Sequence, residues 1–235
     1  MEIQLNADIK KFTRELRGIQ RKQIPFAVSK ALNATAFDAQ KGLQKALGIY
    51  LDRPTKFTIS AVRVKKSDKR KELTAYVGFA GGGGFAPPKM ANALPSEYMS
   101  RLISGGTRRP KKRAIAVPTS AFKTNQYGNI ARGKIKTLLG NPRKYFSGTP
   151  KGRGADAAGI WERMPPNKKK KAGSSARRRN PKAKQQSIRM VIAWEPSTHY
   201  RGGRFPMAKI VEKTVRQQFG DRFRSALKYA LRTAR

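Results

Sequence analysis

Apolar residues recur at spacings of three and four near both ends of the chain, which is the period of an amphipathic helix. The pattern predicts a helix from Asn6, as its N-cap, to about Lys22. A second helix is expected over 25–47, with Pro25 in its first turn. A third should run from Pro206 to about Thr233. We expect its apolar face to pack in the core or in an oligomer through Val211, Val215, Phe219, Phe223, Leu227 and Leu231.

Apolar and polar residues alternate in other segments, which indicates β-strands. Residues 57–61 and 73–79 predict an antiparallel hairpin, and residues 114–117 and 188–194 predict further strands. Pro95 should open a short helix that Gly105 and Gly106 end. Helices segregated from an antiparallel sheet are typical of an α+β fold. The expected architecture is N-terminal helices and a long C-terminal helix packed on a small antiparallel β-sheet, with long basic loop insertions.

The middle of the chain gives weaker signals. Residues 80–113 are rich in Gly and Pro, and residues 123–186 are basic, with a strand suggested only by Ile160, Trp161 and Met164. We therefore expect one α+β domain over residues 1–235, carrying insertions at 80–113 and 123–186, the second of them flexible.

The net charge of the chain limits the kinds of partner that it can have, which the hydrophobic pattern alone does not. The chain has 53 Lys or Arg against 13 Asp or Glu, a net charge of +40. Like charges repel in the compact state, so such a balance favours a polyanionic partner such as nucleic acid. Met1–Asp8 does not have the pattern of a signal peptide, and no apolar run approaches the length of a membrane span. We expect a soluble protein, intracellular at synthesis, with no membrane partner.

Two segments are candidates for non-specific contact with phosphates. Between residues 165 and 186 there are nine cations and no acid: Lys168, Lys169, Lys170, Lys171, Arg177, Arg178, Arg179, Lys182 and Lys184. The polar face of the last helix adds a second set: Lys213, Arg216, Arg224 and Lys228. Such residues bind phosphates by releasing counterions and do not read base sequence. The other interpretation of the nine-cation tract is a solvated loop without a partner.

Groups for catalysis are sparse in the sequence. His199 is the only histidine, there is no Cys, and no pair of carboxylates has the spacing of a Mg²⁺ site. We expect no enzyme activity, no cofactor and no metal. Residues 81–84 form a glycine run that is typical of a flexible linker, whereas residues 148–154 (Gly-Thr-Pro-Lys-Gly-Arg-Gly) could wrap a phosphate non-specifically.

Several short passages resemble phage structural proteins. Tyr98–Thr107 and Ala116–Phe122 resemble the tyrosine, glycine-threonine and proline pattern of phage tail-completion (neck) proteins. Gln23–Ala36 resembles the proline-led, alanine-rich helix of the minor tail protein Z family, typified by phage lambda, and Arg204–Val211 precedes a basic terminal helix, as in that family. The chain departs from these patterns in residues 123–186 and at Ser104, where related neck proteins often have an acidic residue.

The resemblance implies a structural component of a virion, at the head–tail junction or in the tail tube. Its partners would be other neck or tail proteins (connector, tail tube, tail terminator), further copies in a homo-oligomeric ring, and phage DNA bound non-specifically. Its location would be the virion, and the host cytoplasm during assembly. The alternative is a cellular or viral nucleic-acid-binding protein, such as a ribosomal or nucleoid component. A nuclease is a third and weaker alternative.

Overall fold

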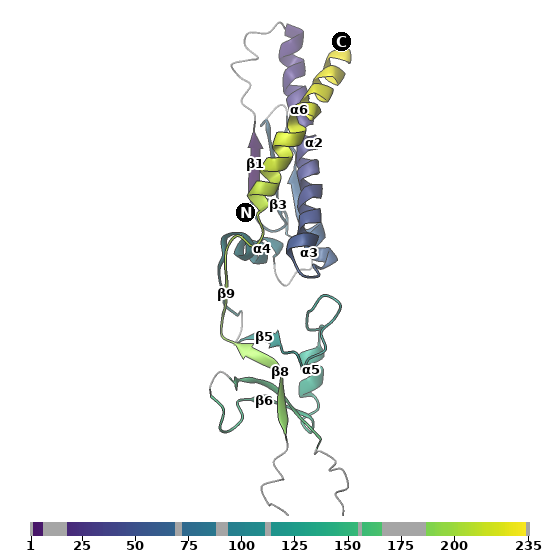
Figure 1. Cartoon of the computed structure of the whole chain (residues 1–235). Helices are drawn as coiled ribbons and strands as arrows, with labels where there is room; N and C mark the ends of the chain where they lie inside the picture. The colour runs from purple at the N-terminus through teal and green to yellow at the C-terminus, as the bar shows by residue number, and fades with distance from the viewer. Residues whose placement is uncertain are drawn as a thin grey trace, which may run out of the picture. The chain divides into compact units, whose positions relative to one another are not determined.

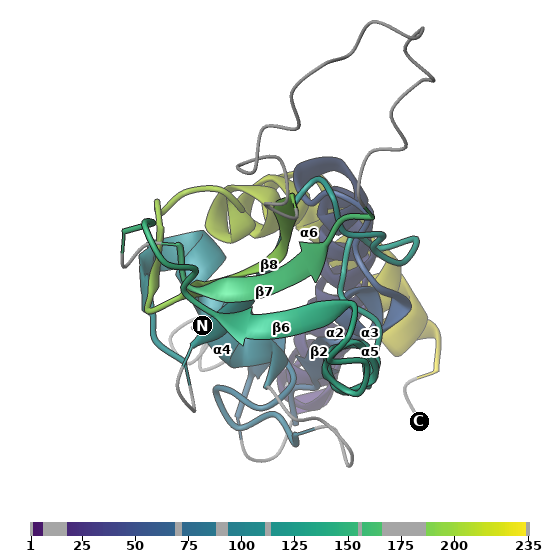
Figure 2. The same ribbon diagram turned by 90° about the horizontal axis from the view of Figure 1, so that it is seen from below.

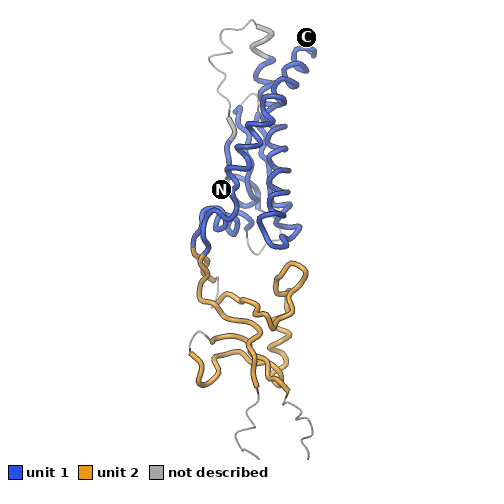
Figure 3. The backbone as a smooth tube through the Cα atoms, viewed as in Figure 1, with its two compact units in different colours: residues 1–106, 200–235 blue, residues 107–199 orange. Residues whose placement is uncertain are grey.

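The computed structural model describes residues 2–6, 18–68, 72–87, 94–110, 114–154, 157–165 and 187–233. The chain forms two compact units: residues 1–106 with 200–235 make unit 1, and residues 107–199 make unit 2 (Figure 3). Helices combine with small antiparallel sheets, so the α+β prediction is confirmed. The division into two units differs from the single domain that we expected over residues 1–235.

Unit 1 is built from two long helices and a three-stranded sheet. Its elements are β1 (Glu2–Asn6), α2 (Gly18–Tyr50), α3 (Lys56–Ser60), β2 (Val62–Lys65), β3 (Thr74–Phe79), α4 (Pro95–Ser104) and α6 (Met207–Arg232). The central strand of the sheet is β3, which pairs antiparallel with both β1 and β2. α2 packs against α6 and also contacts all three strands (Figure 1).

The core of unit 1 follows one stripe of α2. The stripe advances in steps of three and four and is almost fully buried: Ile24, Val28, Leu32, Ala36, Ala39, Leu43 and Leu47. It belongs to the same cluster as Val77 and Phe79 of β3 and Val211 of α6. Beside it, Ala27 and Ala31 of α2 meet Ala226 and Ala230 of α6. These small side chains let the two helix axes approach closely, because interaxial distance depends on the side chains at the contact.

Two predicted helix starts are wrong. Asn6 is not an N-cap but the last residue of β1, where it pairs with Thr74. Pro25 lies inside α2, which begins seven residues earlier at Gly18. A proline already has a helical φ, and in the helix interior it removes one backbone hydrogen bond. Here the helix continues on both sides of it. The rest of the helix expected over 6–22, residues 7–17, lies outside the described part of the chain.

The first strand of the predicted hairpin is also wrong. Residues 56–60 form the short helix α3, whose N-cap Thr55 accepts a hydrogen bond from the Thr58 amide at 3.2 Å. Five alternating residues fit either period, because Phe57 and Ala61 are also one helical turn apart. The hairpin itself is present one element later: β2 pairs antiparallel with β3, which matches the predicted second strand.

Two glycines let two segments of the backbone come into close contact at the end of α4. Gly105 ends the helix with φ +82°, as predicted for its terminator. A Cβ on Gly105 would lie 2.8 Å from the Gly202 nitrogen, and one on Gly202 would lie 2.9 Å from the Ser104 oxygen. Only glycine at both positions permits this approach, which brings residues 105 and 202 together although they are far apart in the sequence.

Unit 2 contains a four-stranded antiparallel sheet in the order β5-β8-β7-β6. Its elements are β5 (Ile115–Pro118), α5 (Lys134–Leu139), β6 (Tyr145–Gly148), β7 (Gly159–Arg163) and β8 (Ile188–Glu195), while β4 (Gly106–Arg108) and β9 (Thr198–Tyr200) each have one residue in unit 1 and two in unit 2. β4 pairs with β9, and Figure 2 shows β6, β7 and β8 side by side. The residues expected to form a flexible insertion, 123–186, thus contribute α5 and two strands to this unit.

The core of unit 2 is small and separate from that of unit 1. Leu138 of α5 packs with Ile160 of β7 and with Val191 and Ile192 of β8. Further residues, half-buried, surround it, among them Phe122, Ile130 and Tyr145. Each unit therefore has its own hydrophobic core, which is the physical reason why the chain divides as it does.

We predict that Leu43→Ala lowers the free energy of unfolding by about 2–5 kcal/mol, since the side chain is fully buried and its removal leaves a cavity. Leu231→Ala is the matched control: Leu231 is 49% exposed, so the change should stay within about 0.5 kcal/mol. Urea unfolding followed by far-UV circular dichroism measures both. Equal losses in the two variants would contradict the assignment of the core.

Candidate nucleic-acid interface

The apolar face of α6 attaches the helix to the core of unit 1. Val211 is fully buried, and Val215, Phe219, Phe223 and Leu227 are half-buried against the core, as predicted. Phe219 and Phe223 also stack on each other, with ring centroids 6.2 Å apart.

Leu231 was predicted on the same face, to pack in the core or in an oligomer; it is 49% exposed and is not part of the core of unit 1. A stripe with a step of exactly four drifts by about 40° per step, because a helix turns about 100° per residue. Over the five steps from Val211 to Leu231 the drift reaches about 200°. The buried positions at this end of α6 are Ala226 and Ala230.

The opposite face of α6 is a row of exposed cations. All four predicted residues of this helix, Lys213, Arg216, Arg224 and Lys228, are exposed. Three further cations lie on the exposed side: Lys209, Arg222 and Arg232. The 26-residue helix is about 39 Å long, and the buried apolar face holds this row on a rigid support.

Ion pairs divide the cations of α6 into two groups. Arg216 donates to Glu212 at 2.6 Å, Arg224 donates to Asp221, and Arg222 makes two hydrogen bonds to Asp38 of α2 at 2.8 and 3.1 Å. Among the described residues no ion pair is found for Lys209, Lys213, Lys228 and Arg232. The unpaired lysines and Arg232 are therefore the stronger candidates for phosphate contact, and the predicted Arg216 and Arg224 are partly neutralised.

The other predicted set cannot be placed on a surface. Lys168, Lys169, Lys170, Lys171, Arg177, Arg178, Arg179, Lys182 and Lys184 all lie outside the described residues. Their assignment to nucleic acid stays a prediction from the sequence.

Unit 2 carries cations that the sequence patterns did not single out. Residues 107–199 contain 24 Lys or Arg against three Asp or Glu. In the described part of this unit the exposed cations are Arg108, Arg109, Lys123, Arg132, Lys134, Lys136, Arg143, Lys144, Lys151, Arg153 and Arg189. The local imbalance between basic and acidic residues could have indicated them.

Glu162 of β7 is the one buried carboxylate in the described part of unit 2. Arg189 donates to it at 2.5 Å, the Lys144 ammonium lies 3.2 Å away, and the Tyr145 hydroxyl donates at 3.4 Å. Burial raises the pKa of Glu162, but hydrogen bonds from Arg189 and Lys144 outweigh it and hold the pKa below its usual value. The carboxylate is thus kept ionised and ties β6, β7 and β8 together.

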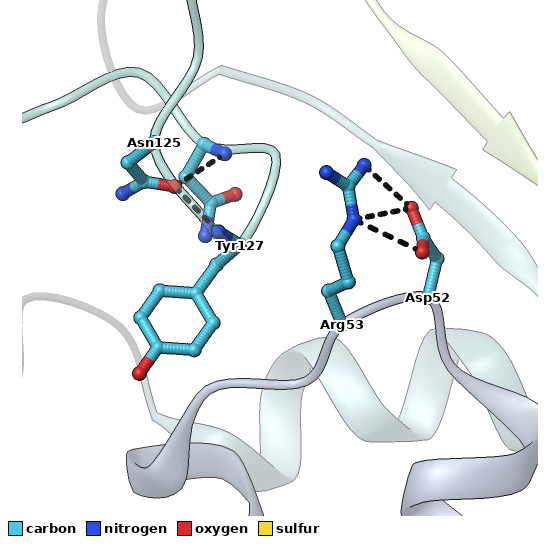
Figure 4. Close-up of polar contacts among 5 residues, drawn as sticks. Asp52, Arg53, Asn125 and Tyr127 are labelled. Carbon is cyan, nitrogen blue, oxygen red and sulfur yellow. Dashed lines mark hydrogen bonds and ion pairs between the residues drawn. The ribbon is translucent and has the colours of Figure 1, made fainter.

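Other polar groups serve local structure. Arg53 has a left-handed φ of +46° and donates to the Asp52 carboxylate at 2.9 to 3.2 Å, and Asn125 Oδ1 accepts from the Tyr127 amide at 3.0 Å (Figure 4). His199 is exposed, with Nδ1 3.3 Å from the Thr107 hydroxyl. The described residues contain no group of three or more His, Cys, Asp or Glu arranged to hold a metal ion.

Comparison with known proteins gives no match: no family model, no curated protein and no solved structure is significantly similar to the chain. Within the described ranges, no helix has the length and apolar character needed to cross a membrane.

We predict that Glu162→Gln destabilises unit 2 by about 1–3 kcal/mol, since it leaves Arg189 and Lys144 without their buried partner. The pKa of Glu162 is lowered in the folded state, so its contribution is present above the unfolded pKa of about 4.3 and is lost as pH falls through the folded pKa. Wild-type unit 2 should lose stability over this acid range, and the variant should lose less there.

Tryptophan fluorescence reports on this unit alone, because both tryptophans, Trp161 and Trp194, belong to it. Glu195→Gln, at the exposed end of β8, is the matched control and should change the midpoint little. Identical behaviour of the two variants would show that the ion pairs of Glu162 do not stabilise the unit.

Proposed function

We propose that the chain is a non-enzymatic structural protein that binds DNA non-specifically through basic surfaces, as a component of a bacteriophage virion. The observation that carries the DNA-binding part is the row of exposed cations along α6, fixed to the core by the opposite face of the same helix. A helix of about 39 Å matches the rise of about 11 base pairs, so one helix can present its cations to a run of phosphates.

Two features support contact with the phosphate backbone over base readout. Seven of the 16 exposed residues of α6 are lysine or arginine. Half or more of all protein–DNA hydrogen bonds go to phosphate and sugar and carry no sequence information. The net charge of +40 also remains far from compensated, since the whole chain has only 13 acidic residues. A polyanion that released its counterions on these surfaces would relieve the repulsion.

The virion part of the proposal comes from the resemblance to tail-completion and minor tail proteins. We place the chain at the head–tail junction or tail tube, as several copies in a ring around the DNA path, in contact with neck or tail proteins. The basic surfaces would then line or clamp DNA as it passes. The proposal includes no reaction, since the sequence has one histidine and no cysteine from which to build the usual catalytic groups.

Affinity for duplex DNA falls as salt rises, with a slope of about −0.9 on a log–log plot for each phosphate engaged. We predict that the double variant Lys213→Ala, Lys228→Ala makes this slope less steep by about 1.8, since two phosphates are no longer engaged. Both side chains are exposed, so the thermal midpoint should not change. Fluorescence anisotropy at several salt concentrations gives the slope. The control is Lys56→Ala with Arg63→Ala, which removes the same charge from exposed positions of unit 1 outside α6. An equal decrease of the slope in the control would refute α6 as the DNA surface.

We also predict that the chain co-purifies with intact virions or tails and stays with them after nuclease treatment. Mass spectrometry of gradient-purified particles tests this. Sedimentation with ribosomes or chromosomal DNA, with release by nuclease, would reject the virion assignment and favour a ribosomal or nucleoid component.

A further inference from the structure

One face of the sheet in unit 2 carries arginines stacked on aromatic rings. Trp161 of β7 lies opposite Phe146 of β6 and Met190 of β8, and opposite residues of an antiparallel pair share a face. The Arg153 guanidinium lies 4.7 Å from the centroid of the Trp161 ring, and that of Arg163 lies 4.5 Å from the centroid of Phe146. The other face packs its Ile160 against Leu138 of α5. The arginine–aromatic face is thus distinct from the core of the unit.

Hydrogen bonds and burial fix the Trp161 ring over which Arg153 lies. The indole Nε1 donates to the carbonyl oxygens of Gly148 and Ala157, both at 3.2 Å, and the Trp161 side chain is almost fully buried. The Arg153 guanidinium is a planar fork that can offer two N–H groups to one phosphate, and its place over a fixed ring restricts the side chain. Less rotamer freedom is lost when such a fork binds a phosphate, and its free face can stack on a base.

An open surface depression of about 530 Å³ lies beside Arg153 and Trp161. Arg153 forms part of its wall, and Trp161, Ile188 and Met190 supply apolar surface. Arg189 also lines the depression, but its guanidinium is paired with Glu162. Arg153 is exposed, and no carboxylate of the described residues pairs with it; Asp156, three residues later, lies outside them. The site therefore combines the guanidinium of Arg153 with apolar surface from Trp161, Ile188 and Met190.

We propose that this depression binds one unpaired nucleotide of a single-stranded nucleic acid, with the phosphate on the edge of the Arg153 guanidinium and the base on its free face or against Met190 and Ile188. The inference rests on the proposed binding of nucleic acid, to which it adds a second site of different chemistry on the other unit. Clefts and cavities of about 300–1,000 Å³ are typical for small ligands, and a base has the planar, apolar faces that this wall can cover. A base in a duplex is paired and stacked on its neighbours, so it would have to leave the helix to reach the site.

The test uses the full chain and three variants with a fluorescein-labelled dT20 oligonucleotide. Arg153→Ala should weaken binding about tenfold or more, whereas Lys151→Ala, which removes the same charge two residues away, should weaken it about twofold. Arg153→Lys keeps the charge but loses the flat fork, so it should resemble Arg153→Ala. Equal affinities for the two alanine variants, or wild-type affinity for Arg153→Lys, would overturn the proposal.

A second readout separates this site from general electrostatics. In a Trp194→Phe background Trp161 is the only tryptophan, and dT20 should change its emission; Arg153→Ala should abolish that change. A 20-base-pair duplex should lose no more affinity from Arg153→Ala than from Lys151→Ala. A larger loss with the duplex would reject the unpaired base as ligand. Comparison with rU20 shows whether RNA or DNA is the better source of the strand.

The two proposals fail in different ways. If the wild-type chain binds neither dT20 nor duplex DNA at low salt, the proposed function fails and this site fails with it. If wild type binds both and the Arg153 variants match Lys151→Ala, only the site on unit 2 is wrong.

Discussion

The packing of α6 against α2 holds unit 1 together. This contact joins two helices that are far apart in the sequence, and it completes a core that neither helix could build alone. Its alanines bring the two helices close, and its larger side chains lie against the core. Because the inner face of α6 is fixed in this way, its cations have only the solvent side available to them. The same contact therefore determines both the stability of unit 1 and the position of its charge.

Carboxylates in this chain neutralise charge locally. Glu162 pairs with two cations of unit 2, while Asp38, Glu212 and Asp221 each pair with an arginine on α6. With 13 acids in the chain, such pairing leaves most of the 53 basic residues uncompensated. Both units carry this excess of positive charge. A polyanion that binds the folded chain more tightly than the unfolded chain would stabilise the fold, because only the folded chain holds its cations at fixed distances from one another.

Periodicity over many residues predicted most of α2 and α6, and the alternation of apolar and polar residues predicted β3, β5 and β8. α4 was predicted from the proline that opens it and the glycines that end it. The prediction for α3 was wrong because its five residues fit two periods, and Leu231 leaves the buried stripe because a four-residue step drifts around the helix. The site around Arg153 depends on the register of β6, β7 and β8, which brings Phe146, Trp161 and Met190 opposite one another and which the sequence did not predict. The composition of residues 148–154 does suggest phosphate contact, but the stacking of Arg153 on Trp161 is a tertiary feature that no local pattern contains.

Gly105 and Gly202, which lie against each other in unit 1, are separated in the sequence by the whole of unit 2. Unit 2 lies between the two parts of unit 1 in the sequence, so a ribosome completes all of unit 2 before α6 emerges. Domains tend to fold as units during synthesis. Unit 2 can therefore close while α2 still exposes the apolar stripe that awaits its partner. Unit 1 thus begins first in the chain but cannot complete its core until unit 2 and α6 have been made, and until then the nascent chain is strongly cationic with an open core.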